Sequence, residues 1–259
     1  MFYQTSRNLG LLLGALLINA GMVAAEPTRI EVAVLAVGAK FIGEQMGGVQ
    51  VLIHDAEGNQ MAEGIIEGPT GETNRIMQAT QAHPEVALAN NASVSFELDL
   101  ERPTRLSVKA TGPLGYPAQQ RSTKTEVLAF PGEHMTGERS LMLSLSGLII
   151  DPESVELSSA GGSALVSFMM ACGCPIVPGG LWDFSDYRLE AEVELDCDAT
   201  RQASFEHAGD NRYRLAVEES PQPVTAVRAR AISTVHPQLS GALTLWESDR
   251  CTPAEAFSE

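Results

Sequence analysis

The residues best suited to chemistry lie in one short segment, 169–175, which reads MMACGCP. Thioether and thiolate sulfurs are soft donors that suit Cu(I) or Zn²⁺. The Cys-x-Cys spacing brings two sulfurs close together across one glycine, and strand alternation places Met170 and Cys172 on the same face. Met170, Cys172 and Cys174 therefore form a candidate soft-metal site, with copper as the implied ion.

The start of the chain bears on this interpretation because it predicts export. Arg7 lies in a short polar segment, an apolar run follows over residues 9–20, and Val23 and Ala25 are the small residues near the end. A positive start, an apolar core of this length and an A-x-A-like end are typical of a secretory signal. We expect residues 1–25 to be cleaved and the mature protein to be periplasmic or secreted.

The four cysteines also fit a disulfide role in an oxidising compartment. They are Cys172, Cys174, Cys197 and Cys251, and four cysteines allow three pairings, among which the sequence does not choose. A bond between Cys172 and Cys174 would close a strained small ring. We therefore expect these two to pair with Cys197 and Cys251, and we favour disulfides over metal binding, with a redox or free-thiol role third.

The loop after the cysteines is a candidate contact surface. It reads PIVPGGLWD over residues 175–183, rigid at its prolines and pliable at its glycines. Trp182, one of only two tryptophans, either covers the end of the core or presents a flat surface to a partner. We take Trp182 and Asp183 as the candidate interaction loop, and for Trp182 we favour the core-covering role over contact with a partner.

Known catalytic patterns are missing from the sequence. It contains no G-x-S-x-G elbow, no HExxH, no P-loop and no GxGxxG, and its five histidines are scattered singly. Glu190, Glu192 and Glu194 alternate along one strand, where a solvated face is favoured over an acid–base pair. We expect a non-enzymatic protein without a cofactor, copper being the alternative.

Composition narrows the possible partners. The formal net charge is −16, which disfavours nucleic acid and anionic membrane surfaces. The hydrophobic content of 44% predicts a packed core. No stretch after the signal is long and apolar enough to span a bilayer. The expected partner is an unidentified protein.

Alternation with a period of two predicts strands along most of the mature chain. It is clearest over residues 49–53, 94–100, 141–145, 189–196 and 213–217, and turn residues at 55–59 and 209–211 predict hairpins. Residues 72–83 predict at most a short helix. Residues 112–125, GPLGYPAQQRSTKT, predict a long loop that is either functional or mobile, and we favour a mobile surface loop.

This pattern indicates an all-β fold of two antiparallel Ig-like β-sandwich modules. We predict the modules at residues 26–151 and 152–251, with a tail at 252–259. The boundary is placed at Asp151 and Pro152 because proline interrupts a strand ladder.

Two stretches resemble known proteins: GGVQVLIHDAEGNQMAEGIIEGPTG at 47–71 and CGCPIVPGGLWD at 172–183. They resemble a group of exported bacterial proteins, and the overall pattern is similar to Ig-like and transthyretin-like sandwich modules. Such modules often serve as binding or spacer domains. The resemblance implies a fold class, but no reaction and no site residues. The leading expectation is an exported binding or interaction protein, and the alternative is a soft-metal protein.

Overall fold

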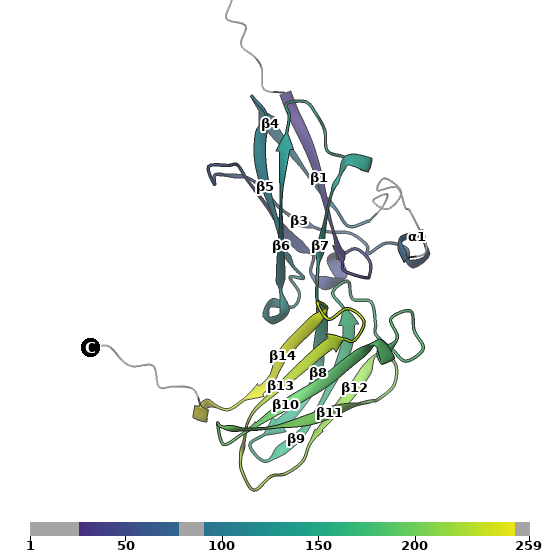
Figure 1. The fold of residues 1–259 in the computed structure, drawn as a ribbon, viewed down its shortest axis with the longest axis vertical. Helices are drawn as coiled ribbons and strands as arrows, with labels where there is room; N and C mark the ends of the chain where they lie inside the picture. Colours follow the sequence, from purple (N-terminus) through teal and green to yellow (C-terminus); the bar gives the residue numbers. More distant parts are fainter. Residues whose placement is uncertain (1–25, 78–90, 252–259) are drawn as a thin grey trace, which may run out of the picture.

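The computed structural model describes residues 26–77 and 91–251, so the expected signal at 1–25 and tail at 252–259 lie outside it. The described chain is built from β-strands that form two stacked groups (Figure 1). The N-terminal region holds β1 (Glu26–Ala36), β2 (Val49–His54), β3 (Gln60–Ile66), β4 (Val94–Leu100), β5 (Thr104–Gly112), β6 (Arg121–Ala129) and β7 (Leu141–Leu145). The C-terminal region holds β8 (Leu148–Ser158), β9 (Gly161–Met170), β10 (Tyr187–Leu195), β11 (Ala199–His207), β12 (Arg212–Val217), β13 (Val224–Ser233) and β14 (Ser240–Glu247).

In the part of the chain that the structure describes, helical structure is limited to short turns outside the strands. They are α1 (Thr73–Met77), η1 (Glu44–Met46), η2 (Pro117–Gln119), η3 (Gly137–Arg139), η4 (Phe184–Asp186) and η5 (Asp249–Cys251). The short helix predicted at 72–83 corresponds to α1, and residues 78–90 lie outside the described part.

The strands form sheets that pack face to face, which confirms the prediction of an all-β sandwich fold. In the N-terminal region the sheet β4-β1-β7 faces the sheet β3-β2-β5-β6. The C-terminal strands follow the order β14-β13-β10-β11-β12-β9-β8, and β11 pairs with β10 along 199–204 and with β12 along 205–207. The pairing is antiparallel throughout the described strands except for β1 with β7, which is parallel.

The alternation of apolar and polar residues along the strands places apolar side chains in the core and polar ones in solvent. In β10 the side chains of Leu189, Ala191 and Val193 are buried, while Glu190 and Glu192 between them are exposed. Both predicted hairpin turns are present, with Gly58 and Gly209 in the left-handed region at φ of 88° and 99°. The buried side chains of both regions belong to one continuous hydrophobic cluster.

The chain passes from one region to the other at Ser146 and Gly147, between β7 and β8. The boundary expected at Asp151 and Pro152 falls inside β8, which pairs with β9. Pro152 lies at a bulge where the register with β9 shifts. A proline is tolerated there because a bulge already interrupts the ladder.

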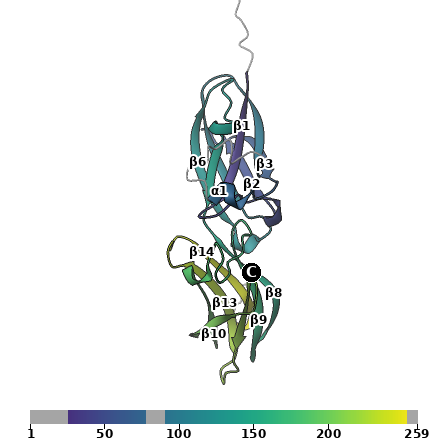
Figure 2. The same ribbon diagram turned by 90° about the vertical axis from the view of Figure 1, so that its right-hand side faces the viewer.

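The long loop predicted at 112–125 is much shorter in the structure. Gly112 ends β5 and Arg121 begins β6, so the connection is residues 113–120, including η2. This connection packs at the junction between the two regions, which are stacked end to end (Figure 2). The expectation of a mobile surface loop is therefore wrong, because Gln119 in it is buried against β8.

Candidate functional site at the junction of the two regions

The segment singled out for its chemistry forms a tight hairpin at the end of β9. The amide of Met170 donates to the carbonyl of Cys174 (2.9 Å), and the amide of Gly173 donates to the carbonyl of Met170 (2.8 Å). Gly173 has φ of 77°. A three-residue loop that ends in a left-handed residue is a standard hairpin connection, and it places glycine at that position. Cys172 and Cys174 therefore lie on either side of the turn glycine.

The two cysteines of this hairpin are bonded to each other, with their Cα atoms 5.4 Å apart. The other disulfide joins Cys197 and Cys251. The prediction of disulfides is confirmed, but the expected cross-pairing is wrong. Cys172 lies close to Tyr187 at the start of β10, because Tyr187 Oη contacts Met170 Sδ at 3.5 Å. Cys197 follows the other end of that nine-residue strand, roughly 25 Å away, beyond disulfide reach.

Contacts from the N-terminal region cover the hairpin. Gln45 Nε2 donates to the carbonyl of Cys172 at 2.6 Å. Gly173 lies so close to Met46 that a Cβ at this position would be 2.8 Å from Met46 Sδ. The exposed fractions of Cys172 and Cys174 are 0% and 4%. Reactive cysteines need partial exposure, so burial favours a structural role for this disulfide.

At the junction, the side chain of Gln119 takes the place that a neighbouring strand would occupy beside Ile150 of β8. The carboxamide of Gln119 donates from Nε2 to the carbonyl of Ile150 (2.9 Å) and accepts from the amide of Ile150 at Oε1 (3.0 Å). Both atoms of Ile150 are on the edge of β8 away from β9, and Gln119 is 9% exposed. One amide side chain thus satisfies a buried backbone donor and acceptor that would otherwise lack partners.

Tyr116 in the same connection bonds to the next residue of β8. Its hydroxyl donates to Oδ2 of Asp151 at 3.0 Å. Burial, followed by the charge of the Asp151 carboxylate and this hydrogen bond, raises the pKa of Tyr116 to about 12. The phenol therefore stays protonated at neutral pH and serves as a hydrogen-bond donor.

The predicted interaction loop also reaches across the junction. Trp182 is half-buried against the core, and its indole Nε1 donates to the carbonyl of Gly38 at 2.9 Å. Asp183 caps η4: its oxygens accept from the amides of Ser185 (2.8 Å) and Gly179 (2.9 Å). These hydrogen bonds lower the pKa of the Asp183 carboxyl. The loop is held by contacts within the chain, which supports the core-covering role of Trp182.

A cluster of buried and half-buried aromatic rings packs against this loop. Tyr213 is fully buried, and its hydroxyl donates to the carbonyl of Ile176 at 2.9 Å. Phe184 stacks on Tyr213 with ring centroids 4.5 Å apart, and Phe168 meets Tyr213 edge-on at 6.2 Å. Such ring pairs contribute about 0.5–1.5 kcal/mol beyond burial, so the loop has a rigid base.

The donors proposed for a soft metal lie near one another but are engaged. Met170 Sδ is at contact distance from the Tyr187 hydroxyl, and the sulfurs of Cys172 and Cys174 are joined. The imidazole of His207 is also engaged, because it bonds to the carbonyl of Asp210 (2.8 Å) and packs beside Tyr213. Over residues 26–77 and 91–251, no group of three or more His, Cys, Asp and Glu side chains is arranged to hold a metal ion.

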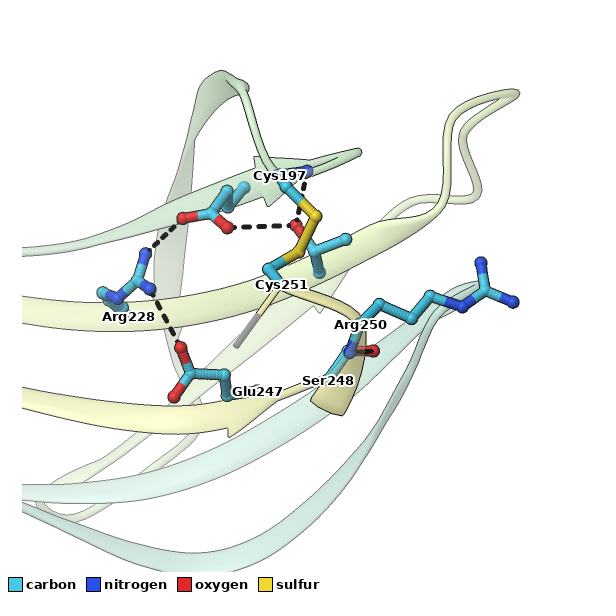
Figure 3. Close-up of a disulfide and its surroundings, with 8 residues drawn as sticks. Cys197, Arg228, Glu247, Ser248, Arg250 and Cys251 are labelled. Atoms are coloured by element: carbon cyan, nitrogen blue, oxygen red, sulfur yellow. Dashed lines mark hydrogen bonds and ion pairs between the residues drawn. A yellow bond between two sulfur atoms is a disulfide. The ribbon is translucent and has the colours of Figure 1, made fainter. Parts of the chain in front are cut away.

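The opposite end of the C-terminal region is closed by Cys197 and Cys251 (Figure 3). Beside this disulfide, Arg228 forms ion pairs with Oε2 of Glu194 at 2.7 Å and with Oε1 of Glu247 at 3.3 Å. The hydrogen bond from Arg228 lowers the pKa of Glu194. The row of glutamates predicted on β10 faces arginines on β13, since Glu190 and Glu192 are register partners of Arg230 and Arg228.

The junction residues can be predicted only in part from the sequence. The length of the loop predicted at 112–125 marks this connection as unusual, but no local pattern distinguishes Tyr116 or Gln119 within it. Gln45 and Met46 follow no pattern that distinguishes them from other polar or apolar residues. Their role depends on which loops meet at the junction, and no local signal carries that information.

Comparison with known proteins adds little. No family model matches the sequence, and no curated protein matches it. Among solved structures, a β-glucuronidase of Parabacteroides merdae aligns with 86% of this chain at 11% identity and a TM-score of 0.21. The chain spans only 25% of that enzyme's length, and so low a score supports no inference about this protein. Within the described part of the chain, no helix has the length and apolar character needed to cross a lipid bilayer.

Proposed function

We propose that this chain is an exported, non-enzymatic binding or interaction protein made of two Ig-like sandwich modules that act as one rigid body. The observation that carries the proposal is the paired hydrogen bonding of Gln119 to Ile150. Interfaces between domains within a chain usually permit relative motion. Here a buried amide pair, a buried disulfide hairpin and the Trp182 contact fix the two regions to each other.

Rigidity of this kind suits recognition. A surface that is already ordered loses less conformational entropy when it binds, so more of the interaction energy appears as affinity. The sheet faces and loops of the two regions hold a fixed relative geometry, which lets a partner contact both at once. The two disulfides agree with an oxidising compartment, which supports the periplasmic or secreted location.

A pull-down with a matched junction variant tests the interaction role. The purified chain is immobilised and incubated with cell-envelope extract, beside Gln119→Ala and the control Gln120→Ala. We expect wild type and Gln120→Ala to retain the same partner protein, and Gln119→Ala, whose junction is loosened, to retain less of it. Repeated recovery of no common protein by the wild-type chain would contradict the proposal.

Export has its own test. N-terminal sequencing of the protein recovered from a periplasmic or culture-medium fraction is expected to begin at Glu26. Recovery only from the cytoplasm, with residues 1–25 still attached, would contradict the proposed location.

A soft-metal function remains the second candidate because Met46 adds a sulfur beside Gly173, the residue between the two cysteines. Only the reduced hairpin offers thiolates, since no cysteine of the described chain is free. If this function is correct, protein from the periplasm should contain two reactive thiols after unfolding without reductant. Reduced protein should then bind one Cu(I), and Cys172→Ser with Cys174→Ser should abolish that binding. Zero thiols would reject the candidate.

A further inference from the structure

The outer face of the sheet β3-β2-β5-β6 carries a pair of lysines that face each other. The chain contains only three lysines, Lys40, Lys109 and Lys124. Lys109 on β5 and Lys124 on β6 are register partners, so two of the three lie directly opposite each other. Like charges in this position destabilise a sheet. The net charge of the protein is −16, so two of its few lysines stand opposite each other on a chain that is otherwise rich in acidic residues.

The lysine pair lies in a surface hollow of about 560 Å³. Arg105, four residues before Lys109 on the same face of β5, adds a third cation to its lining. The full lining comprises His54, Asp55, Ala56, Gly58, Arg105, Ser107, Lys109, Lys124 and Glu126. Cationic nitrogens, a hydroxyl, an imidazole and two carboxylates therefore border one space.

The acidic residues of this hollow offset its cations only in part. Asp55 is engaged by its own turn, because its two oxygens accept from the amide and side chain of Asn59, each at 2.8 Å. Glu126 is shared between Arg105 at 3.8 Å and Lys124 at 3.7 Å, distances that are loose for ion pairs. Lys109 makes no ion pair with any residue that the structure describes. The three cations therefore exceed the two carboxylates of the lining by one charge, and only Glu126 is within ion-pair distance of any of them.

We infer that this hollow binds a small oxyanion, a phosphate or sulfate group, between Lys109, Lys124 and Arg105. An anion placed there would offset the lysine–lysine repulsion and accept hydrogen bonds from three cationic side chains. The Ser107 hydroxyl offers a further donor. An extended polyanion does not fit, because the strongly negative remainder of the protein would repel it. The occupant is a single compact anionic group, free or carried on a small molecule.

Calorimetric titration of inorganic phosphate and sulfate into the full chain tests this inference. Ionic strength is held constant with chloride, so that screening is the same throughout. We expect saturable 1:1 binding of at least one of the two anions, and an affinity about tenfold or more lower in the double variant Lys109→Gln with Lys124→Gln. The control, Arg102→Gln with Arg214→Gln, makes the same charge change at two exposed arginines outside the hollow and should bind as wild type does.

A melting measurement separates loss of the site from loss of the fold. Without phosphate or sulfate, the lysine double variant should melt at the wild-type temperature or higher, because the repulsion is relieved. With the bound anion, wild type and control should gain stability and the lysine variant should not. Absence of saturable binding, equal stabilisation by chloride, or equal weakening in the control would overturn the inference. None of these outcomes bears on a protein partner, so the proposed function is tested separately.

Discussion

The two ends of the C-terminal region are each closed by a disulfide, but the disulfides act over very different lengths of chain. At the junction, Cys172 and Cys174 are two residues apart in the sequence and lie buried beneath contacts from the N-terminal region. At the opposite end, Cys197 and Cys251 are 54 residues apart and tie the end of β14 to the turn after β10. The first end is held by a local hairpin and contacts between regions, and the second by a long covalent link. The comparison indicates that the place of a disulfide in the fold decides whether its loss lowers global stability or loosens only a local turn.

The largest effect on stability is expected from removal of the disulfide between Cys197 and Cys251. The double variant Cys197→Ala with Cys251→Ala should lose about 4 kcal/mol of unfolding free energy, because a bond that spans a long loop strongly restricts the unfolded chain. Urea denaturation monitored by circular dichroism measures this loss. A loss no larger than that of the hairpin double variant would show that the two disulfides are equivalent.

Gln119→Ala at the junction is expected to cost about 2–3 kcal/mol, because it leaves the amide and carbonyl of Ile150 without partners in a buried setting. Gln120→Ala, at the neighbouring residue, should change stability by less than about 0.5 kcal/mol. Small-angle X-ray scattering of Gln119→Ala should also show a broader distribution of overall dimensions. An unchanged profile would mean that the other junction contacts suffice for rigidity.

Removal of the disulfide between Cys172 and Cys174 should lower stability less than removal of Cys197–Cys251. Cys172→Ala with Cys174→Ala is expected to cost about 1–2 kcal/mol, since so short a loop restricts the unfolded chain little. The change should appear locally instead, as faster hydrogen exchange of the Met170 and Gly173 amides that close the hairpin. Unchanged exchange at both amides would show that the turn holds its conformation without the disulfide.

The ion pairs of Arg228 with Glu194 and Glu247 should contribute least to stability, and their contribution should depend on pH. Arg228→Gln is expected to cost under about 1 kcal/mol, because the side chains are partly exposed to solvent. The folded-state pKa of Glu194 lies below its ordinary value of 4.5. The stabilisation from this pair is therefore fully present above that value and is lost as pH falls through the folded pKa. The stability difference between wild type and Arg228→Gln should shrink under acid, whereas Arg230→Gln should show a smaller difference with no such trend.

Much of the fold followed from local patterns. Runs such as 94–100 alternate without a break, and β4 covers those same residues. The turns at Gly58 and Gly209 could be predicted because a left-handed backbone favours glycine. Both signals are carried by neighbouring residues, so one sequence is enough to read them.

The features that cannot be predicted from the sequence all depend on contacts between segments that are far apart along the chain. The cysteine pairing requires knowing that Cys172 and Cys197 lie at opposite ends of β10. The role of the 113–120 connection requires knowing that it meets β8 at Ile150. The facing of Lys109 and Lys124 requires the register of β5 with β6. Composition and periodicity carry none of this information.

The bonding of Gln119 to Ile150 has a consequence for which sequences this fold tolerates. A carboxamide is the one side-chain group that repeats the donor and acceptor of a peptide unit side by side, and asparagine is one methylene too short to reach from the same backbone. A saturation library at this codon, sorted for resistance to unfolding, should therefore enrich glutamine above every other residue, whereas the next codon, for Gln120, should show no such preference. The side chain at position 119 thus takes the place of a peptide unit beside β8, so this exposed-looking connection is constrained as strongly as a core position.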